Sequence, residues 1–192
     1  MKSHNVPRRL ILATGVTLMT VALNTVGAGV ALGASASELN RQATQALREL
    51  YRGTPGAKEL GEKAVGMLIF PSIKKGGFII GGQFGDGVLR KGGKTVGYYR
   101  SLAASYGLQA GGQAFSYVLF FMDTASLQYL DKSEGWELGS GPSLVVLDKG
   151  FGKTLSTTTL QSGVYAYIFG QKGAMAGLGI QGTKITKIHP NP

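Results

Sequence analysis

Few residues of this sequence have side chains that could carry catalysis, and these few are poorly placed for it. Cysteine is absent, which excludes disulfides, zinc–thiolate sites, a cysteine nucleophile and a lipid-modified N-terminal cysteine. His189 lies in the C-terminal tail, where nothing in the sequence positions it over a nucleophile or in a metal-binding cluster. The carboxylates fall in expected helices and turns, so the expected strands lack the pairs that glycosidases need. We therefore expect a protein that is not an enzyme and has no cofactor or metal.

Two short segments resemble the end of a nucleotide-binding phosphate loop, Gly93–Thr95 and Gly152–Thr154. A phosphate loop needs a glycine five positions before its last glycine, and this chain has Val88 and Leu147 there. The glycine-rich segment Gly81–Gly87 lies between two expected strands, and no helix N-terminus follows that could receive a pyrophosphate. We interpret it as a β-turn. The sequence thus gives no support for a nucleotide site.

Basic residues are more informative, because the chain carries a formal net charge of +10, which favours anionic partners. Lys74 and Lys75 precede an expected strand that starts at Gly77, while Arg90, Lys91 and Lys94 flank an expected turn. Turns at one end of an antiparallel sheet can gather such charges. Four cations facing an anionic membrane would contribute ~4 kcal/mol, at ~1 kcal/mol each. The alternative is that each is an ordinary solvated charge.

The first 36 residues have the features of a signal peptide. Lys2, Arg8 and Arg9 precede the apolar run Leu10–Leu32, and Ala34-Ser35-Ala36 supplies a small-x-small cleavage pattern. We expect cleavage after residue 36 and a periplasmic or secreted protein, residues 37–192, which can associate peripherally with a membrane. The alternative is an uncleaved anchor, because the apolar run is long enough to span a bilayer. The sequence does not distinguish the Sec route from the twin-arginine route.

The mature chain starts with a helical part, residues 37–66. Ser37–Arg52 has apolar residues at spacings of three, four and seven, which predicts an amphipathic helix. Its apolar face either packs on the core or lies in a lipid interface. Thr54 is expected to cap a second short helix with Pro55 at its first position.

Residues 67–192 are predicted to be mainly sheet, with one short helix near 123–132 capped by Asp123. The expected strands are 67–70, 77–83, 87–90, 95–100, 105–112, 115–122, 143–147, 164–169, 175–181 and 183–188. Because few helices separate them, the neighbours should be antiparallel, and glycines inside strands suit strong bending. We expect a single α+β domain with a strongly bent sheet or partial barrel. Both faces should be covered, because Phe78–Ile80 and Val118–Phe121 are apolar at consecutive positions. Lipid would then be held by its head group at the surface, without a deep acyl pocket.

Several blocks in order along the chain resemble the SYLF domain, a lipid-binding domain of the Las17-binding, actin-regulator type. The opening blocks are Lys63–Pro71, Lys75–Phe78 and Gly85–Val88; the central block is Gly107–Gly111; the closing blocks are Lys172–Gly177 and Gln181-Gly182. Together these blocks extend from about Lys58 to Ile188, and the leader fits a secreted bacterial branch.

The resemblance implies a non-catalytic domain that binds phospholipid. Lys63 and Lys75 stand on recurrent lysines of the family, and with Lys74, Arg90, Lys91 and Lys94 they form the expected lipid-binding set. Gln113, Ser116 and Gln181 stand where eukaryotic relatives commonly have acids, so properties that rest on those acids, including actin binding, are not carried over.

Our leading hypothesis is an envelope protein that docks on anionic phospholipid membranes through basic turns. The alternative is an envelope interaction module that binds a protein or cell-wall partner. Nucleic acid is not an expected partner, because a secreted chain rarely meets it and its aromatic residues lie inside strands without interleaved arginines.

Overall fold

The computed structural model describes residues 34–77, 80–106, 113–132, 135–147, 161–172, 180 and 182–192. In this part of the chain three helices accompany an eight-stranded sheet. The helices are α1 (Ala36–Gly53), α2 (Pro55–Lys63) and α3 (Thr124–Lys132). The strands are β1 (Gly66–Gly77), β2 (Ile80–Lys91), β3 (Lys94–Tyr106), β4 (Gln113–Phe121), β5 (Trp136–Glu137), β6 (Leu144–Leu147), β7 (Val164–Lys172) and β8 (Lys184–Ile188). The predicted α+β class is confirmed.

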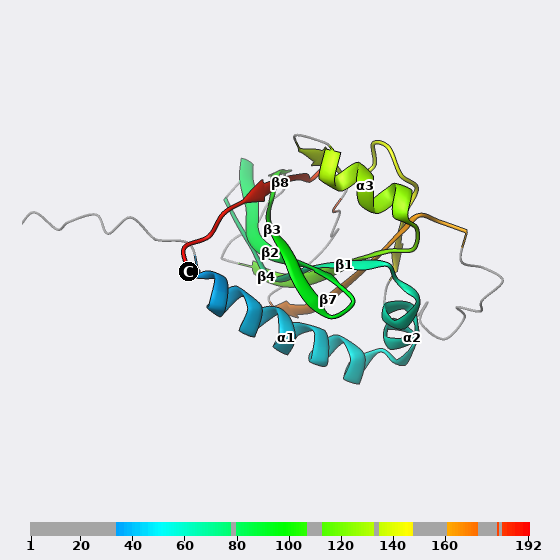
Figure 1. Ribbon diagram of the computed structural model, residues 1–192. Helices are drawn as coiled ribbons and strands as arrows, with labels where there is room; N and C mark the ends of the chain where they lie inside the picture. Colours follow the sequence, from blue (N-terminus) through cyan, green and yellow to red (C-terminus); the bar gives the residue numbers. More distant parts are fainter. Residues whose placement is uncertain are drawn as a thin grey trace, which may run out of the picture. The chain divides into compact units, whose positions relative to one another are not determined.

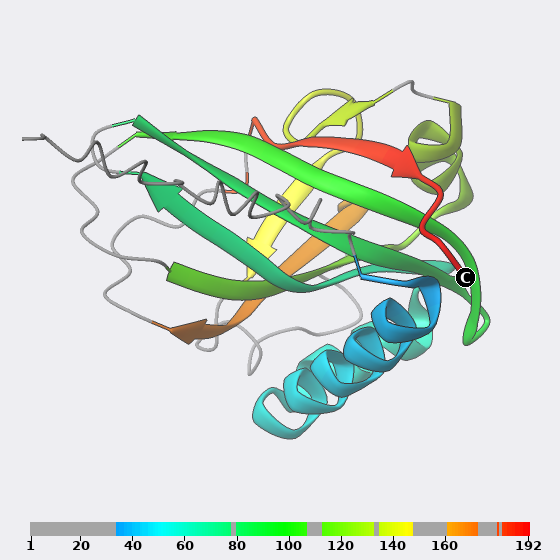
Figure 2. The same cartoon turned by 90° about the vertical axis from the view of Figure 1, so that its left-hand side faces the viewer.

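The strands form one curled sheet in the order β5-β8-β3-β2-β1-β4-β7-β6, and Figure 2 shows its twist. Neighbouring strands are antiparallel except for β6 and β7, which are parallel. The bent, mainly antiparallel sheet agrees with the prediction, since short connections join β1, β2 and β3 in sequence. The predicted strand 175–181 falls largely outside the described residues, and β5 was not predicted.

Helix α1 lies against one face of the sheet together with α2 (Figure 1). Its apolar stripe of Leu39, Ala43, Ala46 and Leu50 is buried against that face, so the helix packs on the core and does not present its apolar side to lipid. Ser35 caps the helix by accepting a hydrogen bond from the backbone N–H of Glu38. None of the described helices combines the length and the apolar character that a membrane crossing requires.

The other two helices begin where predicted, but α2 differs in two details. Pro55 opens α2, whereas the side chain of Thr54 makes no capping hydrogen bond, and α2 ends at Lys63, before the end of the predicted helical part at residue 66. Asp123 does cap α3, because its carboxylate accepts a hydrogen bond of 2.7 Å from the backbone N–H of Ser126.

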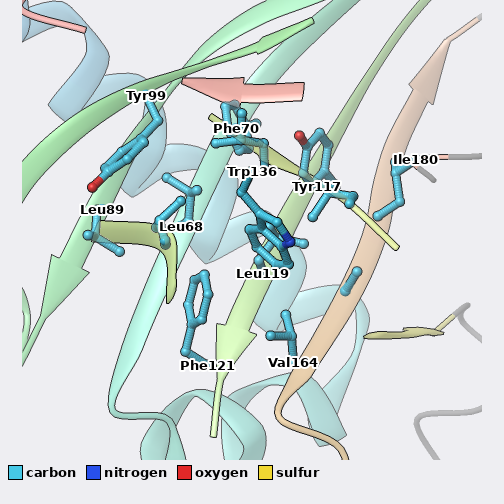
Figure 3. Close-up of a cluster of buried hydrophobic side chains, with 14 of the residues drawn as sticks. Leu68, Phe70, Leu89, Tyr99, Tyr117, Leu119, Phe121, Trp136, Val164 and Ile180 are labelled. Carbon is cyan, nitrogen blue, oxygen red and sulfur yellow. The ribbon is translucent and has the colours of Figure 1, made fainter. Parts of the chain in front are cut away.

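Each face of the sheet carries its own apolar cluster. We call the face with α1 and α2 the outer face, and the face with Trp136 the inner face. Strand β4 shows the division: Val118 and Phe120 pack under α1 and α2, whereas Leu119 and Phe121 point to the inner face. On the inner face they meet Trp136 and residues of α3, with Trp136 near the centre of the cluster (Figure 3). The prediction that both faces are covered holds for this strand.

Strand β1 contains a bulge around Pro71. The pairing register of β1 shifts between Phe70 and Ile73 on the β4 side and between Ile69 and Lys74 on the β2 side. Proline cannot donate a backbone hydrogen bond, so in a central strand it is tolerated at such a bulge. Ser116 of β4 donates its hydroxyl to the carbonyl oxygen of Pro71 at 2.7 Å and thus satisfies a backbone group there.

The predicted β-turn at Gly81–Gly87 is wrong, because this segment is continuous strand within β2. Its glycines are needed where β1 approaches closely. A Cβ atom at Gly85 would collide with the backbone oxygen of Ser72, and one at Gly87 would lie 2.6 Å from the ring of Phe70. Glycine therefore permits the tight bend beside the bulge and does not mark the end of a strand.

Candidate functional site

The basic residues predicted to form one patch lie at two different ends of the sheet. In the β1–β2 pair, Met67 faces Arg90, whereas Lys74 faces Phe84. The seven residue steps from Met67 to Lys74 correspond to about 23 Å of strand at about 3.3 Å per step. The predicted gathering of these charges is therefore wrong, because Lys74 and Lys75 lie near one end of β2 and Arg90 and Lys91 at the other.

Arg90 serves the fold. Its guanidinium donates hydrogen bonds to the backbone oxygen of Asn40 at 3.0 Å and to the hydroxyl of Thr44 at 2.7 Å, which ties β2 to α1. Burial lowers its pKa from the ordinary arginine value. A side chain engaged in this way is not available to a lipid head group.

Among the remaining predicted cations at this end, two are freely accessible. Lys91 forms an ion pair of 3.2 Å with Asp131 of α3, and the carboxylate of Asp131 also accepts a hydrogen bond from Tyr99. Lys94 is exposed at the start of β3, and Lys63 is exposed at the end of α2.

Lys74 and Lys75 lie within β1 rather than in a turn, and they point to opposite faces of the sheet. Lys74 is exposed, whereas Lys75 is only 8% exposed and shares the inner face with Ile73. The expectation that both are exposed charges is wrong for Lys75. The bulge is the physical reason: Leu68 and Phe70 face inward before it and Ile73 after it, so the alternation changes phase.

The outer face next to Lys74 carries an unusual set of exposed residues. Strand pairing places Lys74 opposite Phe84, Phe84 opposite Leu102, and Leu102 opposite Lys184. Phe84 is 54% exposed and Leu102 is 55% exposed, while both lysines are exposed. We call these four residues the outer row. It combines two adjacent large apolar side chains with a cation on each side.

Of the outer row, only Lys74 was among the residues predicted to bind lipid. Phe84 looked like part of a turn, Leu102 fell outside the expected strands, and Lys184 is distant in sequence. The available hint was the presence of large apolar residues inside a glycine-rich, polar stretch.

A second cationic surface lies on the two N-terminal helices. Arg48, Tyr51, Arg52 and Lys58 line an open groove of about 570 Å³. Lys58 is 3.7 Å from Glu62, which offsets part of its charge. This groove is basic but lacks exposed aliphatic side chains.

No cluster of three or more potential metal ligands occurs among the residues with assigned positions. His189 lines a small hollow of about 230 Å³ with Asp86 and Arg100. These two charges already neutralise each other in an ion pair of 2.7 Å, whose hydrogen bond raises the pKa of Arg100.

Part of the chain also matches a known protein family. Residues 102–189 match the family described as Ysc84, Las17-binding protein actin regulator, whose domain is also called SYLF. This part of the chain belongs to the SYLF family. The matched SYLF segment includes all of β4, β7 and β8, and Leu102 and Lys184 of the outer row. The description of the family names two activities of its members, binding of Las17 and regulation of actin.

A relative extends the similarity beyond the matched SYLF segment. Beta cell expansion factor A of Aeromonas veronii is 30% identical over 148 residues, which cover 76% of this chain. The chain spans about half the length of that relative, 54%. The similarity supports the SYLF assignment made from the sequence blocks and adds no site residue.

Proposed function

We propose that this SYLF domain docks on anionic phospholipid membranes through the outer row. The observation that supports the proposal is the register that brings Phe84 and Leu102 together between Lys74 and Lys184, all four exposed. Apolar side chains can enter the boundary between head groups and acyl chains while the lysines contact lipid phosphates. This differs from docking through basic turns, because the contact surface is the outer face of strands.

The expected strength is that of a peripheral membrane protein. Two lysines near an anionic surface contribute about 2 kcal/mol. Burying the exposed half of a phenylalanine and a leucine adds about 2 kcal/mol, since full burial of each contributes about 1.5–3 kcal/mol. A total of about 4 kcal/mol corresponds to roughly a thousandfold in partitioning. Binding should therefore be reversible and weaken with salt, but the apolar part should persist.

The proposal also includes a place in the cell envelope. It is supported by the order of Arg8, Arg9, the apolar run Leu10–Leu32 and the small residues that come next, which is typical of exported proteins. The domain would then meet a membrane from the periplasmic or extracellular side.

Co-sedimentation with vesicles tests the docking surface. The protein is mixed with vesicles of phosphatidylglycerol and phosphatidylcholine, or of phosphatidylcholine alone, at low and high salt. Lys74→Gln with Lys184→Gln should reduce binding to the anionic vesicles about thirtyfold at low salt, at about 1 kcal/mol per charge. Phe84→Ser with Leu102→Ser should reduce the binding that remains at high salt.

Matched controls remove two charges or two exposed apolar side chains elsewhere. Arg48→Gln with Arg52→Gln alters the helical groove, and Val96→Ser with Val146→Ser alters two other exposed apolar residues. If the groove variant loses binding and the outer-row variants do not, docking occurs through the helices and the proposed surface is wrong.

The same surface could instead contact a protein, as the description of the SYLF family suggests for its own partners. Absence of binding to either vesicle at any salt would contradict the lipid proposal. Retention of a specific envelope protein by the wild type and its loss in the outer-row variants would then support the protein alternative.

A further inference from the structure

The three residues that precede the expected mature chain, Ala34, Ser35 and Ala36, are part of the folded domain. The hydroxyl of Ser35 accepts a hydrogen bond of 3.3 Å from the backbone N–H of Glu38. The backbone oxygen of Ser35 accepts a second hydrogen bond, of 2.9 Å, from the N–H of Leu39. Removal of Ser35 would therefore leave two N–H groups at the start of α1 without their acceptors.

The residues on either side of this cap contact distant parts of the chain. The N–H of Ala36 donates a hydrogen bond of 2.8 Å to the backbone oxygen of Asn191, and the C-terminal tail lies beside the start of α1 in both Figures 1 and 2. Ala34 packs against the apolar cluster of the outer face and lines a hollow together with Ile188. A chain that began at Ser37 would lack all of these contacts.

A start at Ser37 would also place a positive charge where α1 disfavours it. Cleavage before this residue creates an ammonium group within the first turn of the helix, and the N-terminal end of a helix already carries partial positive charge. The acid of that turn, Glu38, is engaged in an ion pair of 2.6 Å with Arg41. A cut three residues earlier would keep the cap and place the new ammonium outside the helix.

The sequence contains a second cleavage pattern at that earlier position. Ala31-Leu32-Gly33 has small residues at its first and third positions, as Ala34-Ser35-Ala36 does, and it lies where the apolar run ends. A signal peptidase acts on the unfolded chain, so both patterns are open to it. Only the cut after Gly33 gives a product that retains the cap of α1 and the contacts of Ala34.

We propose that the mature chain begins at Ala34, through hydrolysis of the peptide bond between Gly33 and Ala34 by a signal peptidase. Water adds across this bond, which leaves the carboxylate of Gly33 on the released leader and the ammonium of Ala34 on the domain. This cut replaces the one expected after residue 36. The inference rests on the export that is part of the proposed function, and it does not depend on membrane docking through the outer row.

Mass spectrometry of the mature protein tests the position of the cut. The full precursor is produced with its own leader in a bacterial host, and the intact mass and the N-terminal peptide of the envelope form are determined. We expect the chain to start at Ala34. Gly33→Leu, which puts a bulky residue directly before the bond, should reduce this product at least about tenfold. Ala36→Leu, the matched change in the other pattern, should leave the same start and an amount within about twofold of the wild type.

Thermal unfolding of the processed protein provides a second readout. Ser35→Ala in the precursor alters the mature protein only if residue 35 is retained, and it should then lower the midpoint by about 2–4 °C, as loss of a typical N-cap does. Ser35→Thr, which keeps a capping hydroxyl, should unfold close to the wild-type temperature. An unchanged midpoint in Ser35→Ala contradicts the proposal.

Fractionation of the cells separates failure of this inference from failure of the proposed function. An envelope form that starts at Ser37 or at Leu32, or normal processing of Gly33→Leu, overturns the inferred bond while export still holds. An intact chain in the membrane fraction overturns the cut and supports an uncleaved anchor. An intact chain that stays in the cytoplasm overturns both the cut and the export. Co-sedimentation of the outer-row variants with vesicles tests docking independently of where the chain starts.

Discussion

At the level of Lys74 and Lys75, the usual distribution of polar and apolar side chains between the interior and the surface is reversed on both faces of the sheet. On the outer face Phe84 and Leu102 are exposed, while on the inner face Lys75 and Gln83 are buried. Ordinary folding places large apolar residues inside and leaves lysine and glutamine in water. Both departures reduce stability, and they occur on neighbouring positions of the same strands. Such a local conflict is typical of a functional region, because selection for binding tolerates what selection for stability would remove.

The other end of the same strands obeys the usual rule on both faces. There Ile69 and Val88 are fully buried on the outer face, and Leu68 and Leu89 are buried on the inner face. Helix α1 covers this end, whereas a Cβ atom placed at Gly76 would meet no atom within 4 Å. The covered end stabilises the fold, whereas the outer face of the other end is exposed at Lys74, Phe84 and Leu102.

The largest expected contrast is between two leucines that lie on different faces. Leu119 is fully buried in the inner cluster, so Leu119→Ala should lower the free energy of unfolding by about 3 kcal/mol. Leu102→Ala should lower it by less than about 0.5 kcal/mol, because half of its side chain already contacts water. Urea denaturation measures both values. Equal losses for the two variants would mean that Leu102 supports the fold and is not a free surface residue.

Two glycines of β2 provide a second contrast. Gly85→Ala should destabilise the protein by about 2 kcal/mol, because the new methyl group collides with the backbone at Ser72. Gly82→Ala should be neutral or stabilise by up to about 1 kcal/mol, because the nearest atom to its Cβ position is 3.9 Å away. Thermal unfolding of the two variants compares them. A tolerated alanine at Gly85 would contradict the close approach of β1 at the bulge.

Alkaline pH should lower the free energy of unfolding through two buried tyrosines of the inner face, Tyr99 and Tyr117. Burial raises the pKa of Tyr117, whose hydroxyl donates to Ser101 at 2.8 Å, and burial together with Asp131 raises the pKa of Tyr99. Both tyrosines stay protonated in the folded state, whereas the unfolded chain releases these protons above about pH 10. Their contribution is therefore complete below about pH 10 and declines above it, by about 1.4 kcal/mol per tyrosine for each further pH unit.

Urea midpoints from about pH 9 to 11 measure this decline on either side of the ordinary tyrosine pKa, and ultraviolet absorbance follows tyrosine ionisation. In Tyr117→Phe the free energy of unfolding should fall less steeply with pH, by about 1.4 kcal/mol per pH unit, because one of the two tyrosines no longer contributes. An unchanged slope in Tyr117→Phe would show that Tyr117 ionises normally and is accessible to water.

Much of the architecture was predictable because it depends on local patterns. The apolar spacing between Leu39 and Leu50 predicted α1, and Asp123 marked the start of α3. Four consecutive apolar residues at Val118–Phe121 predicted a strand buried on both faces. The β5 strand escaped prediction because two residues are too short to show a period.

The candidate sites were only partly predictable. Lys74 and Lys75 were both chosen for their charge, but charge does not specify which face a side chain occupies. Continuing the alternation of Leu68 and Phe70 through the strand would have placed Lys74 inside and Lys75 outside. Pro71 was the one residue that could have signalled the bulge, because a central strand accommodates proline only where the pairing is interrupted.

By itself, then, the sequence determined the helices, most of the strands and the absence of cysteine chemistry. These features depend on residue type and on the short-range spacing of apolar residues. The tertiary structure decided which residues share a surface. The bulge at Pro71 turned Lys75 inward, and strand pairing brought Lys184 beside Leu102 although the two are far apart along the chain. Register depends on the bends and close approaches of the whole sheet, and no local pattern contains that information.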